Sequence, residues 1–349
     1  MTVRDDNNRP PQNSAALVSI RNLVKHFDIT GGWLEQLKFK GGRIHREKTV
    51  VRAVNDISID IREGETVSVV GESGCGKSTL ARTVMGLYPP ESGTIHYRDE
   101  RIDHLPESQL KPFRTRMQMV FQDPYASLNP RMVVGDILKE PIRFHQPTID
   151  ARTLKDKVAT VMEQVGIDPD WQNRYPHEFS GGQRQRISIA RALAVDPEFI
   201  VADEPIAALD VSIQAQILNL MMDLQEQRGL TYLFISHDLS VVEHISERVA
   251  VMYLGALCEL ASAATLFTSP HHPYTRALLS AIPRLGGTFR HTKLPGDVPT
   301  PIRLPAGCVF HTRCPHVRKR CRHEIPTLLT LPDETRVACH GVEENWIRD

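Results

Sequence analysis

The sequence predicts an α/β protein in which helices cover both faces of a largely parallel sheet, and three observations support this class. Short apolar runs with the length of buried strands alternate along the chain with longer amphipathic segments. One such run, residues 67–70, leads through a glycine-rich loop into a helix-like segment. Another, Phe199–Asp203, ends in a carboxylate and is followed by a second one, Glu204, at the position where open α/β sheets bind ligands. Because parallel strands are usually connected by helices, this alternation indicates a parallel sheet.

The expected elements follow one another along the chain. Residues 1–15 are charged and rich in Asn and Pro, which predicts a disordered, solvated tail. Strands are expected at residues 17–27, 50–61, 117–121, 199–203, 231–236 and 249–254, and helices at 78–87, within 133–174 and 180–196, and at 211–228. Residues 28–49 hold two Gly-Gly pairs, which indicates an inserted loop. Ten of the 24 prolines lie between Pro270 and Pro332, so long regular elements are not expected there.

The composition narrows the classes of function. The chain has 349 residues, with 42 Lys and Arg against 42 Asp and Glu, so no net charge attracts it to nucleic acid or to an anionic membrane. No stretch approaches the roughly 18 apolar residues of a membrane-spanning helix. The first residues lack the apolar core of a secretory signal peptide. The sequence therefore predicts a globular protein of the cytosol, where thiols stay reduced.

The glycine-rich loop follows the pattern G-x-x-x-x-G-K-[ST] between an expected strand and an expected helix. Its glycines let backbone N–H groups surround a phosphate chain, Lys77 supplies a charge for the β- and γ-phosphates, and the Ser78 hydroxyl can bind Mg²⁺. The alternative, an ordinary glycine-rich turn, is disfavoured by the strand before it and the helix after it. The expected ATP-binding residues here are Gly71, Glu72, Ser73, Gly74, Cys75, Gly76, Lys77, Ser78 and Thr79.

Polar side chains follow three other expected strands. After the strand 199–203, Asp203 can hold Mg²⁺ and Glu204 can orient and deprotonate a water in line with the γ-phosphate. His237 follows the strand 231–236 and can hydrogen-bond the γ-phosphate. Gln122 follows the strand 117–121 and can contact both Mg²⁺ and the attacking water. Each residue alone is also typical of a loop start or a helix cap, and the prediction depends on their order along the chain.

A second phosphate cradle is predicted at Ser180, Gly181, Gly182 and Gln183, where a hydroxyl and two glycines open a basic helix. One ATP hardly needs two separate cradles within one domain. The presence of two cradles therefore predicts a second chain, in which the segment 180–183 of one chain contacts the ATP bound by the glycine-rich loop of the other. The alternative is a serine N-cap followed by two loop glycines, which would be reasonable for an isolated pentapeptide.

These motifs occur in the order found in the nucleotide-binding subunits of ATP-binding cassette (ABC) transporters, and the chain resembles that family over residues 16–267. The segment 180–183 separates this family from other P-loop NTPases. The resemblance implies an α/β P-loop NTPase of ABC type: a mostly parallel sheet core, an antiparallel β part and a helical subdomain at about residues 125–185. Residues 268–349 are then a small irregular C-terminal extension.

The resemblance also assigns individual roles. It matches Phe27 to the aromatic that stacks on adenine, Gln122 to the Q-loop, residues 180–183 to the signature, Asp203 and Glu204 to Walker B with its base, Asp210 to the D-loop and His237 to the switch histidine. The chain departs from the family pattern at two positions. Phe179 stands where Leu is usual, and Ala207 stands where a Ser is frequent, which removes one hydroxyl near the expected dimer interface. The insertion 28–49 directly follows Phe27.

Two further segments resemble the dipeptide and oligopeptide importer branch of the family, residues 121–130 (FQDPYASLNP) and 272–279 (HPYTRALL). This resemblance implies an ATPase that powers import of peptides or related solutes through integral-membrane permease subunits. It also implies a second ATPase subunit, identical or homologous, and indirectly a solute-binding protein. The chain is then a peripheral protein at the cytoplasmic face of the plasma membrane. Residues 123–132 are the expected contact surface for the permease, with plain loop packing as the alternative.

Two other classes of function are alternatives. A non-transport ABC ATPase of DNA repair or translation is disfavoured by the balanced charge, by the lack of a long coiled-coil insertion and by the importer-type extension. A P-loop kinase is disfavoured because the segment 180–183 would have no role in it. Selection of the solute is expected to lie in the permease and the binding protein.

The proline-rich segment holds four cysteines with the spacing C-x5-C-x6-C-x17-C, namely Cys308, Cys314, Cys321 and Cys339. A reducing compartment disfavours disulfides, and four thiolates suit either zinc or an iron–sulfur cluster. The spacing matches no short C-x2-C zinc pattern. The resemblance to peptide-importer ATPases implies a cysteine-ligated [4Fe–4S] cluster, with zinc as the second choice and free cysteines as the third. Candidate substitute ligands are His311 and His340, and the expected inert apolar cysteines are Cys75 and Cys258.

Overall fold

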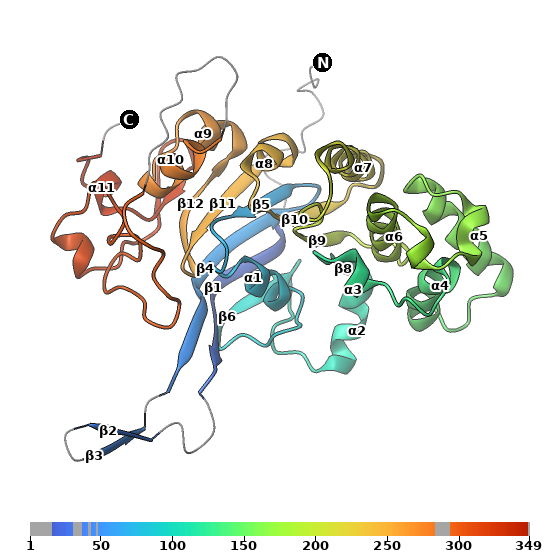
Figure 1. Cartoon of the computed structure of the whole chain (residues 1–349), viewed down its shortest axis with the longest axis horizontal. Helices are drawn as coiled ribbons and strands as arrows, with labels where there is room; N and C mark the ends of the chain where they lie inside the picture. The colour runs from blue at the N-terminus through green and yellow to red at the C-terminus, as the bar shows by residue number, and fades with distance from the viewer. Residues whose placement is uncertain (1–15, 31–36, 41–42, 47, 283–293, 348–349) are drawn as a thin grey trace. The chain divides into compact units, whose positions relative to one another are not determined.

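The computed structural model describes residues 16–30, 37–40, 43–46, 48–282 and 294–347, and Figure 1 labels most of their elements. Contacts divide the chain into two compact units. The first comprises residues 1–19, 59–66 and 96–233, and the second comprises residues 20–58, 67–95 and 234–349. The expected tail, residues 1–15, lies outside the described residues.

The first unit is built on the strands β8 (Met117–Val120), β9 (Phe199–Asp203) and β10 (Thr231–Ile235), in the order β8-β9-β10. β8 and β9 run parallel, with Val120 opposite Ala202. Every residue of β9 and β10 is buried. A strand covered on both faces has no polar side, which explains why both sequences are almost continuously apolar. The carboxyl ends of β8 and β9 lie side by side because the strands are parallel neighbours.

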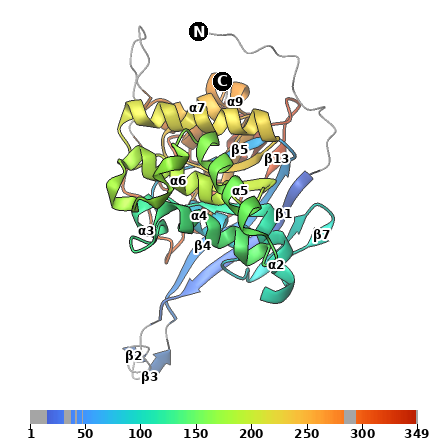
Figure 2. The same cartoon turned by 90° about the vertical axis from the view of Figure 1, so that its right-hand side faces the viewer.

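Helices of the first unit pack as a group, shown in green and yellow in Figure 2. α4 (Val134–His145), α5 (Ala151–Gln164) and α6 (Gly181–Leu193) contact one another, and α6 also contacts α7 (Val211–Arg228). The buried side chains of α5 recur at helical spacing, which confirms the predicted helix. The shorter elements are β7 (Glu100–Arg101), α3 (Pro124–Ser127), η2 (Pro169–Asn173) and η3 (Pro176–Glu178).

Helix α2 (Glu107–Arg116) was not predicted from the sequence. Its single buried side chain, Phe113, gives no apolar periodicity, and it contains Pro112, which usually argues against a helix. Its position is set by contact with β8. Tertiary packing therefore determines this helix where local sequence does not.

The second unit contains five strands in the order β13-β14-β12-β11-β5. β5 (Thr66–Val70) runs parallel to β11 (Arg248–Tyr253), with Val70 opposite Val251. β11 forms an antiparallel pair with β12 (Ala256–Ser262), which was not predicted. β14 (Arg336–Val337) pairs with both β12 and β13 (Leu329–Thr330), again antiparallel. The strands expected at residues 67–70 and 249–254 are confirmed.

Three further strands, most of whose residues belong to the second unit, form a sheet in which β1 (Ala16–Asp28) lies between β4 (Val50–Arg62) and β6 (Ser92–Tyr97). The buried residues of β4 alternate as predicted. Residues 28–49 were expected to form a loop, but they contain an antiparallel pair, β2 (Leu37–Lys40) with β3 (Arg43–Arg46). Residues 31–36, 41–42 and 47 of this insertion lie outside the described residues.

The helices of the second unit are short. They are α1 (Lys77–Val84), α8 (Leu239–Ile245), α9 (Ala263–Thr268), α10 (Pro273–Leu279), η4 (Arg320–Arg322) and α11 (His340–Glu343). After residue 268 the longest described helix, α10, has seven residues, which confirms the prediction from proline content. Among the described helices, none has both the length and the apolar character to cross a membrane.

One buried cluster joins the sheet of the second unit to the proline-rich segment. Val70 of β5, Val251 and Tyr253 of β11, Tyr274 of α10 and Phe310 all belong to it. The segment after residue 268 is therefore packed directly on the strands that carry the glycine-rich loop. The domain boundaries expected at residues 16, 125, 185 and 267 stay predictions.

Candidate functional site

The glycine-rich loop runs from the end of β5 to the start of α1, as its sequence predicts (Figure 1). Gly71 and Gly76 have φ values of 153° and 106°. A Cβ atom at Gly71 would collide with the carbonyl oxygen of Met252, and one at Gly76 with that of Ala53. Glycine is therefore required at both positions by backbone conformation and by close packing.

Lys77 closes this loop. It is 5% exposed, and its Nζ donates to the carbonyl oxygens of Gly71 at 2.8 Å and Glu72 at 3.2 Å. The ammonium group is thereby fixed against the loop, with Ser78 next to it in the first turn of α1. Cys75 is buried in the same loop, and burial raises the pKa of its thiol, which fits an inert apolar residue.

The loop is also held from the proline-rich segment, which the sequence did not predict. The Glu72 N–H donates to Tyr274 Oη at 3.0 Å, and Arg313 Nη1 donates to both carboxylate oxygens of Glu72, at 2.8 and 3.1 Å. Burial lowers the pKa of Arg313, but its hydrogen bonds and the Glu72 charge raise it, so the net shift is upward and the guanidinium stays charged. Arg313 belongs to no motif and lies 241 residues from Glu72, so no sequence pattern pairs them.

Phe27 and His237 lie in the same unit as the loop. The Phe27 ring packs edge-on against Tyr88, with centroids 5.3 Å apart, and Lys25 Nζ lies 5.1 Å from its centroid. His237 is exposed and directly follows Ser236, whose N–H donates to the carbonyl oxygen of Val69 at 3.3 Å. This bond holds His237 near the end of β5, the strand that leads into the loop. The stacking role of Phe27 and the switch role of His237 stay predictions.

In the first unit the structure brings Gln122 and Glu204 together. Gln122 Nε2 donates to Glu204 Oε2 at 2.9 Å, across the ends of the parallel strands β8 and β9. Asp203, the last residue of β9, is 2% exposed. Glu204 has a φ of 49°, a left-handed conformation that is uncommon outside glycine and is concentrated at functional sites. The two acids thus have different environments, one enclosed and one held by an amide.

The segment 180–183 starts helix α6 with a capping box. The Gln183 N–H donates to Ser180 Oγ at 3.3 Å, and the Ser180 N–H donates to Gln183 Oε1 at 2.9 Å. Ser180 is exposed, and Gly181 and Gln183 are half-buried. The serine cap that was the alternative is therefore present in the chain. The cap leaves the Ser180 hydroxyl exposed at a helix N-terminus, where anions are favoured. The same geometry is therefore compatible with a serine N-cap and with a phosphate cradle.

The predicted D-loop residue Asp210 is exposed at the start of α7, and the Ile213 N–H donates to its carbonyl oxygen at 2.9 Å. Gln214 Nε2 holds the preceding turn by donating to the carbonyl oxygens of Ile206 and Leu209. The predicted site residues therefore fall into two groups. The second unit carries Phe27, the loop and His237; the first carries Gln122, residues 180–183, Asp203, Glu204 and Asp210.

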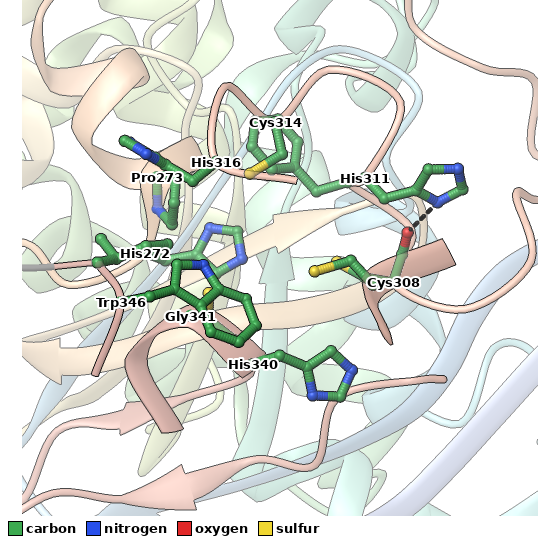
Figure 3. Close-up of a pocket in the computed structure, with 13 residues that line it drawn as sticks. His272, Pro273, Cys308, His311, Cys314, His316, His340, Gly341 and Trp346 are labelled. Carbon is green, nitrogen blue, oxygen red and sulfur yellow. Dashed lines mark hydrogen bonds between the residues drawn. The ribbon is translucent and has the colours of Figure 1, made fainter. Parts of the chain in front are cut away.

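The four cysteines of the proline-rich segment line a single pocket (Figure 3). The Cys308 N–H donates to the carbonyl oxygen of Cys321 at 2.9 Å, which joins two of them through the backbone. Figure 3 shows the sulfur atoms of Cys308 and Cys314 inside the pocket and the His311 ring turned away from them, bonded through Nδ1 to the Cys308 carbonyl at 2.9 Å. His340 lines the same pocket, and its Nε2 lies 3.1 Å from the carbonyl oxygen of Glu324.

The protonation and arrangement of the pocket thiols bear on both cofactor alternatives. Burial raises the pKa of Cys308 to about 12 and that of Cys314 to about 11, so both are neutral thiols near pH 7 until a metal displaces their protons. A single zinc ion holds its thiolates at about 2.3 Å from one centre. Among the described residues, no three His, Cys, Asp or Glu side chains are arranged to ligate one metal ion. This finding favours neither a zinc ion nor an iron–sulfur cluster, and the cofactor of the four cysteines stays a prediction.

Two protein-family models match the chain. Residues 54–207 match the ABC transporter model, and residues 258–321 match the model of the oligopeptide/dipeptide transporter C-terminal region. Among curated proteins, the chain is 52% identical over 330 residues to a putative oligopeptide transport ATP-binding protein, YkfD of Bacillus subtilis, covering 93% of this chain and 95% of that protein. It is 46% identical to the di/tripeptide transport ATP-binding protein DppF of Pseudomonas aeruginosa, covering 94% of this chain and 98% of that protein.

Solved structures agree with the fold. A dimeric bacterial ABC transporter cassette is similar with a TM-score of 0.61 and 26% identity, covering 70% of this chain and 98% of that chain. The post-hydrolysis dimer of the same cassette, bound to ADP and Pi, gives a TM-score of 0.60 at 26% identity and the same coverage. The predicted α/β P-loop fold of ABC type is therefore confirmed.

Proposed function

The chain belongs to the ABC transporter family, and we propose that it is the ATP-hydrolysing subunit that powers import of peptides or related solutes through a membrane permease. One observation carries the proposal: a single chain holds both an ABC cassette match and, after it, the oligopeptide/dipeptide transporter C-terminal region. The second region is named for oligopeptide and dipeptide transporters, so it favours transport over the alternative, an ATPase of DNA repair or translation. Relatives along nearly the whole chain are named as peptide transport ATP-binding proteins.

Each site residue has a proposed task in binding or hydrolysing ATP. Lys77, already fixed against the loop, would neutralise the β- and γ-phosphates of ATP, and the loop N–H groups would surround them. Ser78, Gln122 and Asp203 would hold Mg²⁺, which supplies charge neutralisation to the phosphates when bound. Glu204 would deprotonate the attacking water, and His237 would hydrogen-bond the γ-phosphate. Phe27 would stack on adenine.

A second ATPase subunit is part of the proposal. ABC cassettes assemble as dimers in the similar solved structures. In this chain Ser180 is exposed at the N-terminus of α6, where its hydroxyl and the first N–H groups are favourable to an anion. Ser180, Gly181, Gly182 and Gln183 would therefore complete the γ-phosphate site of the other subunit, with Asp210 next to the interface. The subunits would sit peripherally on the cytoplasmic face of the membrane, against the permease.

The cysteine pocket has a proposed cofactor. Cys308, Cys314, Cys321 and Cys339 would hold a [4Fe–4S] cluster, for which four thiols around one pocket provide the ligands. Such a cluster can accept or release an electron when bound. Zinc is the second choice, because the spacing C-x5-C-x6-C-x17-C matches no short C-x2-C zinc pattern. His311 is tied to the Cys308 carbonyl, which makes it a weaker substitute ligand than the sequence indicated.

Co-purification tests the function directly. The tagged full chain, expressed with its genomic neighbours, is expected to bring down an integral-membrane permease from detergent extracts. In proteoliposomes its ATP hydrolysis is expected to rise on addition of peptide-loaded binding protein. Lys77→Ala is the control, since it removes the positive charge proposed to bind the phosphates of ATP while leaving the surface of residues 123–132 intact. Association with ribosomes or DNA in place of a permease would contradict the proposal.

A further inference from the structure

Glu72 places a carboxylate inside the loop proposed to bind the phosphates of ATP. Such loops attract anions through oriented backbone N–H groups, and a negative side chain among them opposes that attraction. The Glu72 side chain is 27% exposed, so it is only partly screened by water. A carboxylate at this position needs a cationic partner if the loop is to take an anionic nucleotide.

Arg313 is that partner. Its Nη1 donates to both Glu72 carboxylate oxygens, at 2.8 and 3.1 Å, and its side chain is 9% exposed. The Arg313 N–H donates to the carbonyl oxygen of Phe310 at 3.0 Å, which fixes the turn that carries it. The Phe310 ring in turn packs 5.3 Å from that of Tyr253 and 5.4 Å from that of Tyr274. The guanidinium is therefore held in place by a buried aromatic cluster.

The backbone of Glu72 is fixed by the same surroundings. Its N–H donates to Tyr274 Oη at 3.0 Å, and its carbonyl oxygen accepts from Lys77 Nζ at 3.2 Å. Tyr274 is fully buried in the aromatic cluster. The N–H, the carbonyl and the carboxylate of this one loop residue are thus each bonded, two of them to the proline-rich segment. Arg313 is the member of this set that changes the charge of the loop.

We propose that Arg313 is a positioning residue for ATP binding, which neutralises the Glu72 carboxylate so that the loop accepts the nucleotide phosphates. The inference rests on the proposed role of the loop as the ATP site. It differs from a purely structural role in one consequence. Loss of Arg313 weakens nucleotide binding because it leaves the Glu72 carboxylate unpaired, so removing the Glu72 charge as well restores nucleotide binding.

The test compares four full-length proteins: wild type, Arg313→Gln, Glu72→Gln and the double variant. Equilibrium binding of a fluorescent ATP analogue, competed with ATP and ADP, is measured at low and high salt. Arg313→Gln is expected to weaken ATP binding about tenfold. This is the size of the repulsion expected between an unpaired Glu72 carboxylate and the phosphates of ATP at the dielectric constant near a protein surface. The loss of affinity in Arg313→Gln is expected to be smaller for ADP than for ATP, and to decrease at high salt. Because the Arg313 effect acts through the Glu72 charge, the double variant is expected to bind ATP within about threefold of Glu72→Gln and more tightly than Arg313→Gln.

Steady-state kinetics provide a second measurement, in which Arg313→Gln raises KM for ATP and leaves kcat nearly unchanged. Arg320→Gln is the matched control, because Arg320 lies in the same segment but pairs with Glu324, Glu343 and Glu344. If Arg313→Gln does not fold, the ATP affinity of Glu72→Gln is compared with that of the double variant. Similar affinities support the inference, and clearly weaker binding by the double variant contradicts it. The inference is overturned if folded Arg313→Gln binds ATP like wild type, or if the double variant binds as weakly as Arg313→Gln. Failure of wild type to bind ATP would instead contradict the proposed function.

Discussion

The side chain of Gln122 donates a hydrogen bond to the carboxylate of Glu204, with 2.9 Å between Nε2 and Oε2. The two residues lie 82 positions apart, and the parallel pairing of β8 with β9 brings them together. A hydrogen bond from an amide donor fixes the direction of a carboxylate. Glu204 also has left-handed backbone, so its orientation is set from both the chain and the neighbouring strand.

The first prediction concerns Glu204 as the base. Glu204→Gln keeps the shape and the partner of the side chain but cannot take a proton, so kcat for ATP hydrolysis should fall by roughly 10²–10⁴ while ATP still binds. Phosphate release and nucleotide binding measure the two effects separately. Glu198→Gln is the matched control, since Glu198 precedes the amino end of the same strand. Near-normal turnover by Glu204→Gln would remove Glu204 from this role.

The second prediction concerns Ser180. Ser180→Arg places a bulky cation at the exposed N-terminus of α6, and we expect hydrolysis to be blocked while each chain still binds ATP through its own loop. The change also removes a helix cap, which contributes about 1 kcal/mol. Ser262→Arg controls for that loss, because Ser262 caps α9 in the same way by accepting from the Thr265 N–H. Normal hydrolysis by isolated monomers would contradict a role in the partner's site.

The third prediction concerns the cysteine pocket. Protein purified without oxygen is expected to contain iron and acid-labile sulfide and to show broad visible absorbance, which Cys314→Ser and Cys339→Ser abolish. Because burial raises the pKa of the Cys308 and Cys314 thiols, reconstitution should release protons and improve as pH rises from 6 to 8. Cys258→Ser is the matched control, since Cys258 is buried in β12 and is not part of the pocket lining. Metal analysis that finds zinc alone would overturn the cluster assignment.

The fourth prediction concerns the pH dependence of stability. His272 is fully buried, and desolvation lowers its pKa to about 3. Between pH 3 and about 6.5 the unfolded chain binds a proton that the folded chain does not, so this residue makes stability fall as pH falls through that range. From pH 7 to pH 5 the loss is about 2 kcal/mol. Urea unfolding at both pH values measures it.

His272→Asn is the informative variant for this prediction. Asn keeps an acceptor for the Tyr274 N–H, which His272 Nδ1 accepts at 3.0 Å as the cap of α10, but it does not titrate. The variant should lose about 2 kcal/mol less than wild type between pH 7 and pH 5, whatever its stability at pH 7. An equal loss in both proteins would show that His272 is not the source of the acid sensitivity.

Local sequence was sufficient for much of the fold. Buried strands such as β9, helices with a clear apolar face such as α5, and the loop between β5 and α1 follow from composition and spacing alone. α2 and β12 did not follow, because one has a single buried side chain and the other continues an apolar stretch after a tight turn. Both owe their conformation to the neighbours they pack against.

The site divides in the same way. The glycines, Lys77, Asp203 and Glu204 carry their chemistry in residue type and position after a strand, so the sequence by itself determined what kind of ligand the chain takes. The tertiary structure decided which side chains meet: Gln122 with Glu204, Arg313 with Glu72, and four cysteines around one pocket. The physical reason is that a motif records local backbone geometry, whereas these contacts join residues far apart in the chain through sheet order and buried packing.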